Sequence, residues 1–121
     1  MELKKKIVET IQSLYSDEGL EKGGYVTEDG RVVTCDNDSP NPLENFSFKI
    51  EDLMIINDEE DIIALFHTHP NGTSAMTKQD FKAFVNYPNF YHLILGKNGL
   101  LCYKVTERET VIIEDLVIDE S

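Results

Sequence analysis

Two histidines one residue apart offer the first chemistry in this sequence. His67 and His69 close an apolar run over residues 62–66, which predicts a short buried strand. Because side chains two residues apart on a strand point to the same face, both imidazoles can lie side by side at its end. Pro70 has no backbone N–H to donate, so ladder pairing stops there and the chain turns away. The two histidines therefore form a candidate bidentate clip for a metal ion.

A third ligand follows a short distance along the chain. Residues 71–74 have turn chemistry, and the next residues begin a helical pattern with Thr77 at the N-cap and Asp80 in the first turn. The intervening loop can fold Asp80 back over the histidines. Two neutral imidazoles and one carboxylate, with a fourth position left open, are the ligand set of a catalytic zinc ion. Thr77 and Asp80 are explained equally well as an ordinary helix N-terminus, but that reading leaves the paired histidines without a use.

The spacing of these residues resembles the signature of the JAMM (JAB/MPN) metallopeptidases. In that family HxHP is followed after six residues by serine and after two more by aspartate, and the chain has His67, His69, Pro70, Thr77 and Asp80 in those places. Thr77 keeps the hydroxyl of the usual serine and adds a methyl group. The resemblance implies a cytidine-deaminase-like α/β sandwich and a zinc ion held by both histidines and Asp80. It also implies that the Thr77 hydroxyl donates to the developing oxyanion.

The family also has a glutamate upstream of this motif. It stands three residues before a glycine that opens the first strand, and Glu21 with Gly24 fits this pattern, with Gly23 where many relatives have cysteine. Glu18 is the rival, and a surface carboxylate at a helix end is the plain alternative for either residue. The resemblance assigns this glutamate the task of holding and deprotonating the zinc-bound water, in the hydrolysis of a peptide or isopeptide bond.

The remaining residues of metal-binding type are expected to be structural. His92 lies in the middle of an apolar stretch, where a histidine is more often a satisfied core residue than a ligand. Cys35 and Cys102 are too few and too far apart for a zinc ribbon or a disulfide scaffold. Each is expected to sit in a strand as a small buried hydrophobic residue.

The elements that must position the candidate site follow from periodicity and turn chemistry. Apolar residues at helical spacing predict a first helix over residues 2–15. Alternation and turn residues then predict a hairpin over 25–35, a strand over 46–50, a short helix over 51–56, the strand before His67, a helix from Thr77 to Tyr87, strands over 89–95 and 100–105, and one or two edge strands over 111–118. This order indicates an α/β sandwich in which helices flank a central mixed β-sheet.

Composition excludes several classes of protein. The 121 residues suffice for one domain, spanning residues 1–121, with a single core. With 23 acidic and 11 basic residues the net charge is −12, so the chain repels phosphate backbones and nucleic acid is not an expected partner. No apolar run approaches the length of a membrane span, and the first residues lack the apolar core of a signal peptide. We therefore expect a cytoplasmic protein without a membrane partner.

The resemblance also bears on the substrate. The chain is close to a minimal JAMM core, without the insertions by which eukaryotic deubiquitinating relatives hold ubiquitin, and residues 42–52 look like the corresponding segment of phage tail-tip assembly proteins. We expect a peptidase of phage tail assembly, present in the host cytoplasm or the virion, or one of bacterial protein processing. The alternatives are a desampylase-like isopeptidase acting on ubiquitin-like tails and a JAMM-fold scaffold with little or no turnover. The sequence leaves the oligomeric state open.

Overall fold

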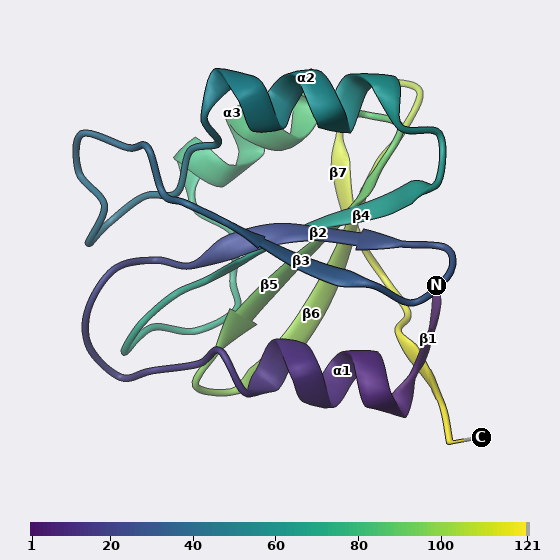
Figure 1. The fold of residues 1–121 in the computed structure, drawn as a ribbon, viewed down its shortest axis with the longest axis horizontal. Coiled ribbons are helices and arrows are strands. Elements are labelled where there is room, and N and C mark those ends of the chain that lie inside the picture. The colour runs from purple at the N-terminus through teal and green to yellow at the C-terminus, as the bar shows by residue number, and fades with distance from the viewer. Residues whose placement is uncertain (121) are drawn as a thin grey trace.

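The protein is a single small α/β domain, and the structure, a computed structural model, describes residues 1–120. Three helices flank a central mixed sheet of six strands, with α1 on one face and α2 and α3 on the other (Figure 1). The elements in chain order are β1 (Glu2–Lys4), α1 (Lys5–Gln12), β2 (Gly23–Thr27), β3 (Val32–Cys35), α2 (Ile50–Asp58), β4 (Ile62–Thr68), α3 (Lys78–Asn86), β5 (Tyr91–Gly96), β6 (Gly99–Val105), β7 (Val111–Glu114) and β8 (Val117–Asp119). The predicted fold class, an α/β sandwich with a central mixed sheet, is confirmed.

The strand that carries His67 and leads directly into His69 lies inside the main sheet. The strand order is β3-β2-β4-β5-β6-β7, in which β4 and β5 are parallel and all other neighbours are antiparallel. Because β4 is paired on both sides, its C-terminal end is held between β2 and β5. Strands β1 and β8 form a separate parallel pair that joins the two ends of the chain.

The alternation of side chains along β4 separates the core from the site. Ala64 and Phe66 belong to the apolar cluster beneath α1, which also contains Ile7 and Ile11 of that helix. Leu65 points to the opposite face, into the cluster under α2. His67, two residues further on, shares this second face because the side chains of a strand repeat every two residues. The sheet therefore has a closed apolar face under α1 and presents His67 on the face covered by α2 and α3.

The first predicted helix is shorter than its hydrophobic pattern suggested. It begins at Lys5 and ends at Gln12, while Glu2–Lys4 is extended and pairs with β8. Leu3 is buried in the same cluster as Ile7, so its apolar character fitted the helical spacing although its backbone is a strand. A pairing partner more than one hundred residues away is invisible to local periodicity, and this is why the prediction over residues 2–15 was wrong at its start. At its end, Leu14 and Tyr15 donate to the carbonyls three residues back in a turn that follows α1.

The predicted strand over residues 46–50 is absent from residues 1–120 as the structure describes them. This segment is irregular, and Ile50 already belongs to α2. The backbone of Ser47 bonds to the Asn37 side chain and to the Asp38 N–H rather than to a neighbouring strand. The rings of Phe46 and Phe48 pack edge to face, with centroids 4.9 Å apart. Alternating apolar residues here serve a packed loop, and the prediction of a strand was wrong.

The other predicted elements are present with small shifts at their ends. The hairpin is β2 and β3, the short helix is α2, and the helix opened by Thr77 is α3. The strands predicted over 89–95 and 100–105 are β5 and β6, and the edge strands are β7 and β8. Among the helices of residues 1–120, none has the length and apolar character needed to cross a membrane.

Candidate metal centre

The backbone around His67 and His69 is bonded on both sides. Strand pairing places His67 opposite Gly23 of β2 and Ile94 of β5. Thr68 donates its N–H to the Lys22 carbonyl at 2.8 Å, and its buried hydroxyl accepts from the Lys22 N–H at 2.9 Å. The His69 N–H donates to the Leu95 carbonyl at 2.8 Å beyond the end of the strand. Both imidazoles are therefore carried by a backbone with little freedom.

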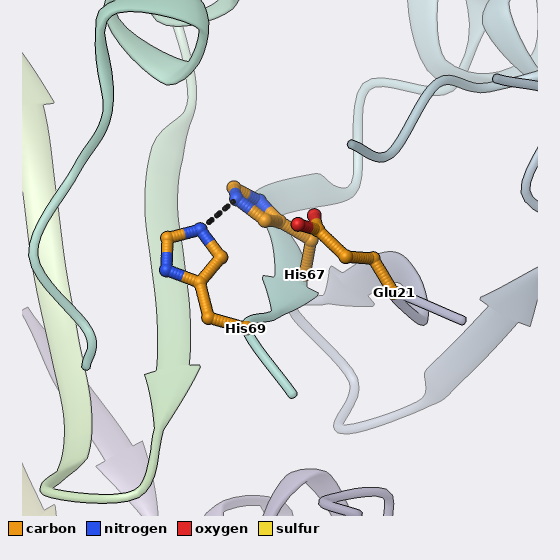
Figure 2. A group of neighbouring side chains, drawn as sticks. All are labelled: Glu21, His67 and His69. Atoms are coloured by element: carbon orange, nitrogen blue, oxygen red, sulfur yellow. Dashed lines mark hydrogen bonds between the residues drawn. The ribbon is translucent and has the colours of Figure 1, made fainter. Parts of the chain in front are cut away.

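The two imidazoles and one carboxylate converge on a single point. The Nε2 atoms of His67 and His69 are 3.2 Å apart (Figure 2). The two carboxylate oxygens of Asp80 lie 3.0 Å from Nε2 of His67 and 3.1 Å from Nε2 of His69. Ligand atoms at the 2.0–2.1 Å bond lengths of a tetrahedral zinc ion are separated by about 3.3 Å. The sequence prediction that Asp80 folds back over both histidines describes what the structure shows.

The hydrogen bonding of His69 is compatible with a cation at this point. Nδ1 of His69 lies 2.7 Å from the Thr73 carbonyl oxygen, which can only accept, so Nδ1 carries the proton. In a neutral imidazole Nε2 is then an acceptor, yet it faces a carboxylate oxygen of Asp80. A second proton on the imidazole or a bound metal ion satisfies both atoms, and a carbonyl behind the imidazole is the usual partner of a metal-bound histidine. The residues present therefore fit a metal ion.

Contacts with the β5–β6 hairpin fix the loop that carries Thr73. Ser74 is fully buried, and its N–H and hydroxyl both donate to the side-chain oxygen of Asn98. The Tyr103 hydroxyl donates to the Ser74 carbonyl and accepts from the Met76 N–H. Gly96 lies so close that a Cβ on it would be 2.3 Å from the Ser74 nitrogen. The loop between His69 and α3 is thus held against the hairpin by backbone contact.

The start of α3 positions Asp80. The Thr77 hydroxyl accepts from the Asp80 N–H at 3.1 Å, and the Asp80 carboxylate accepts from the Thr77 N–H at 2.9 Å, which is a reciprocal capping box. The helix-cap reading of these two residues is therefore correct, and for Asp80 it coexists with contacts to both histidines, while Thr77 is exposed and touches the site through Asp80. Because the Thr77 hydroxyl accepts in this bond, its own proton stays available for donation.

Glu21 joins the histidines from the segment before β2. Its carboxylate points toward both imidazoles, and each of the three residues offers a ligand atom within 4.8 Å of the others (Figure 2). Its side chain is only 6% exposed. The Glu21 backbone is held by its N–H to the Pro42 carbonyl and by the Asn37 amide, which donates to the Glu21 carbonyl. Glu18 is exposed and does not belong to this group, so the structure favours Glu21.

The site perturbs the titration of its own members. Burial raises the pKa of Glu21 to about 8, while His69 opposes this rise and Asp80 adds to it. Burial also raises the pKa of Asp80, but hydrogen bonds from His67 and His69 outweigh it and hold that pKa well below its usual range. For His69, burial lowers the pKa, and the contacts with Asp80 and Thr73 more than restore it, so it lies above its ordinary value. Shifts of this kind, in buried and interacting groups, are typical of functional sites.

The residues expected to be structural do lie outside the group. His92 is buried in β5, bonds to the Tyr87 carbonyl through Nε2 at 2.9 Å and stacks on Phe84. Burial lowers its pKa to about 4, and the hydrogen bond to Tyr87 opposes this only in part. Cys35 and Cys102 are free, in β3 and β6, and Cys102 is fully buried while Cys35 is half-buried.

No family model matches this chain, and the search of curated proteins finds no match either.

A cavity of about 590 Å³ adjoins the candidate metal centre on the side of His67 and Asp80. The sequence prediction missed it, because its walls come from segments that lie far apart in the sequence. Among its lining residues are Phe46 and Phe48 of the irregular segment, Leu53 of α2, and Phe84 and Tyr87 at the end of α3. The one local signal was the pair of phenylalanines, which alternation assigned to a strand.

Proposed function

We propose that this protein is a zinc-dependent peptidase of the JAMM type, which hydrolyses a peptide or isopeptide bond with an activated water. The observation that carries the proposal is the convergence of His67, His69 and Asp80 at 3.0–3.2 Å with a second, buried carboxylate, Glu21, beside the histidines. The motif spacing supports the same reaction. The mixed sheet with helices on both faces is compatible with a cytidine-deaminase-like sandwich.

In this proposal His67, His69 and Asp80 hold the zinc ion. When bound, zinc lowers the pKa of its water to about 7 and polarises the scissile carbonyl. Without a metal ion, contacts with both imidazoles hold the pKa of Asp80 well below its usual range, and a bound cation would likewise favour the ionised carboxylate. The Thr73 carbonyl keeps the proton of His69 on Nδ1 and so leaves Nε2 free to act as a ligand.

Glu21 moves the proton. Its carboxylate accepts a proton from the attacking water and returns it to the nitrogen of the leaving amine as the C–N bond breaks. Burial raises the pKa of the Glu21 carboxyl to about 8 when no metal ion is bound, and this favours uptake of a proton. A divalent cation nearby favours the ionised carboxylate, so the group starts as a base. Because its backbone is bonded to Asn37 and Pro42, the carboxylate is held at a fixed place.

Thr77 stabilises the negative charge that develops on the carbonyl oxygen. Its hydroxyl accepts from the Asp80 N–H, which orients the oxygen and leaves the hydroxyl proton free for the substrate. The hydroxyl is fixed by the first turn of α3, the same turn that supplies Asp80. On this account, threonine in place of serine keeps the donor.

We propose phage tail assembly or bacterial protein processing as the setting of this activity. The segments between its elements are short and lack the insertions by which eukaryotic deubiquitinating relatives hold ubiquitin. A desampylase-like action on ubiquitin-like tails is the nearest alternative substrate class. A scaffold without turnover is a different class, and it predicts that a Glu21→Gln variant complements the native host or phage as well as the wild type does.

The decisive experiment compares two glutamates at matched zinc content. Glu21→Gln should keep zinc and lower cleavage of an amide-linked reporter by about 10²-fold or more, the usual contribution of a positioned proton-transfer group. Glu18→Gln is the matched control and should cleave like the wild type, since Glu18 is exposed and outside the cluster. Equal activity of the Glu21→Gln variant and the wild type would refute the assignment of the base.

A further inference from the structure

We propose that the cavity beside the metal centre takes a large apolar side chain of an extended polypeptide, next to the amide presented to the metal centre, and that a nearby carboxylate of the ligand pairs with lysines at its rim. This inference rests on the proposed function for the position of the amide. The occupant itself is argued from the walls of the cavity.

The walls are apolar and aromatic. Phe46, Phe48 and Tyr87 line the cavity and are only half-buried, so their rings have apolar surface that nothing in residues 1–120 covers. Leu53 of α2 adds an aliphatic wall, and Phe84 closes the side nearest the metal centre. A volume of about 590 Å³ falls within the ordinary range of ligand pockets, about 300–1,000 Å³. Such a lining favours a Phe, Leu or Met side chain over a polar one.

The cavity abuts the groups that would do the chemistry. His67 and Asp80 are themselves lining residues. The Phe84 ring lies 6.2 Å from the His67 ring and stacks on His92 at 4.3 Å, so aromatic surface reaches the metal ligands without a gap in the wall. A side chain seated here therefore belongs to a residue whose own backbone amide, or the next one, lies at the metal centre.

The outer wall is built with little freedom to collapse. Phe46 lies directly over Gly23 of β2, where a Cβ would come within 2.7 Å of its ring. Asn37 ties the backbone beneath this wall together, because its amide donates to the carbonyls of Glu21 and Asn45 and its oxygen accepts from the Ser47 N–H. The same side chain thus fixes the base and the segment that carries both phenylalanines. The cavity is accordingly a preformed site next to a preformed base.

The charge at the rim is opposite to that of the whole chain. The net charge is −12, yet the lining residues include two exposed lysines, Lys78 and Lys82, and Asp80 is the sole acidic residue among them. Since the metal ion would neutralise Asp80, the rim attracts anions. The ligand group that fits is a carboxylate, supplied either by an acidic side chain or by the end of a polypeptide.

Peptide binding tests the inference apart from turnover. The protein is the zinc-loaded Glu21→Gln variant, and the probes are short Gly-Ser peptides that carry one Phe or one Ala at the same position. We expect the Phe peptide to bind about tenfold more tightly or better, the discrimination a hydrophobic pocket gives between side chains of different size. Equal affinity for the two peptides would overturn the proposal.

Matched variants locate the binding. Ala83 is exposed on α3 and lines the cavity, so Ala83→Phe should fill the space and abolish the preference for Phe at unchanged zinc content. Ala75→Phe makes the same exchange at an exposed alanine outside the lining and should keep the preference. If both variants retain it, the peptide binds elsewhere and the cavity has no such role.

Two further arms separate the sources of the carboxylate and the two proposals. If the carboxylate comes from a side chain, a Glu beside the Phe should tighten peptide binding. If it comes from a chain end, a free C-terminus should tighten binding instead. The double variant Lys78→Gln, Lys82→Gln should remove the gain in affinity in either case. A carboxylate without effect in both positions would refute this part. If the Phe peptide binds selectively but the wild type cleaves neither peptide, the inference stands and the peptidase proposal falls. If the wild type cleaves Phe and Ala peptides with equal affinity and rate, the peptidase proposal stands and the inference falls.

Discussion

Replacing Gly96 by alanine should damage the metal centre from a distance. Gly96 ends β5 and touches neither histidine ring, but its backbone lies against the loop that carries Thr73. An alanine Cβ there would be 2.3 Å from both the Ser74 nitrogen and the Thr73 carbonyl carbon, which are backbone atoms. To reach an ordinary contact of 3.4 Å the loop must retreat by about 1 Å.

The size of the effect follows from what the loop holds. The Thr73 carbonyl accepts from Nδ1 of His69 at 2.7 Å, and a displacement of about 1 Å takes this contact beyond hydrogen-bonding distance. Loss of a partner behind a metal-bound histidine lowers metal affinity by about 10- to 100-fold. That range corresponds to roughly 1.4–2.8 kcal/mol of binding free energy. The Gly96→Ala variant should therefore bind zinc 10- to 100-fold more weakly.

The assay is a zinc titration against a competing chelator, with Gly99→Ala as control. Gly99 lies on the same hairpin and has a positive φ of 113°, but a Cβ on it would meet no atom within 4 Å. Its replacement strains the hairpin without pushing the loop, so it should lower the melting temperature and leave zinc affinity near that of the wild type. If Gly96→Ala binds zinc as tightly as Gly99→Ala, the loop does not position His69.

Three further changes have defined outcomes. Burial lowers the pKa of His92 to about 4, against about 6.5 in the unfolded chain, so its contribution to the unfolding free energy is intact above pH 6.5 and is lost as the pH falls toward 4. Over this range the wild-type protein with chelator should lose about 3 kcal/mol more unfolding free energy than His92→Gln. Parallel pH curves of the two proteins would contradict this. Asn37→Ala should lower the unfolding free energy by about 1–3 kcal/mol in denaturant titrations, because the carbonyls of Glu21 and Asn45 lose a donor, and an unchanged midpoint would count against that role. Thr77→Ala should reduce reporter cleavage at unchanged zinc content whereas Thr77→Ser should not, and equal loss in both would indicate that the threonine methyl group matters more than the hydroxyl.

Local patterns predicted the parts of the fold that depend on local physics. The spacing of His67 and His69 predicted neighbouring imidazoles at the end of a strand, and their Nε2 atoms do lie 3.2 Å apart, although β4 ends at Thr68 and His69 follows it. The pair Thr77 and Asp80 predicted the start of α3, because a capping box is formed within four residues. Glu21 was preferred over Glu18 from the family spacing, and the structure brings Glu21 to the histidines.

The failures involve contacts between distant residues. Glu2–Lys4 became a strand because it pairs with β8 at the other end of the chain, and no periodicity within the first fifteen residues encodes that partner. Residues 46–50 alternate like a strand, but their hydrogen bonds go to Asn37 and Asp38, and their rings line a cavity with α2 and α3. The contacts that hold the loop of Thr73 and Ser74 likewise come from Gly96, Asn98 and Tyr103 of the β5–β6 hairpin, which follows the histidine motif in the sequence.

The most direct test of the central claim is the zinc content of the purified protein. Protein prepared without chelator and analysed for metals should carry one zinc ion per chain, and a His67→Ala, His69→Ala double variant of the same purity should carry none, because two of the three proposed ligands are gone. An equal zinc load in the wild type and the double variant would contradict the metal centre.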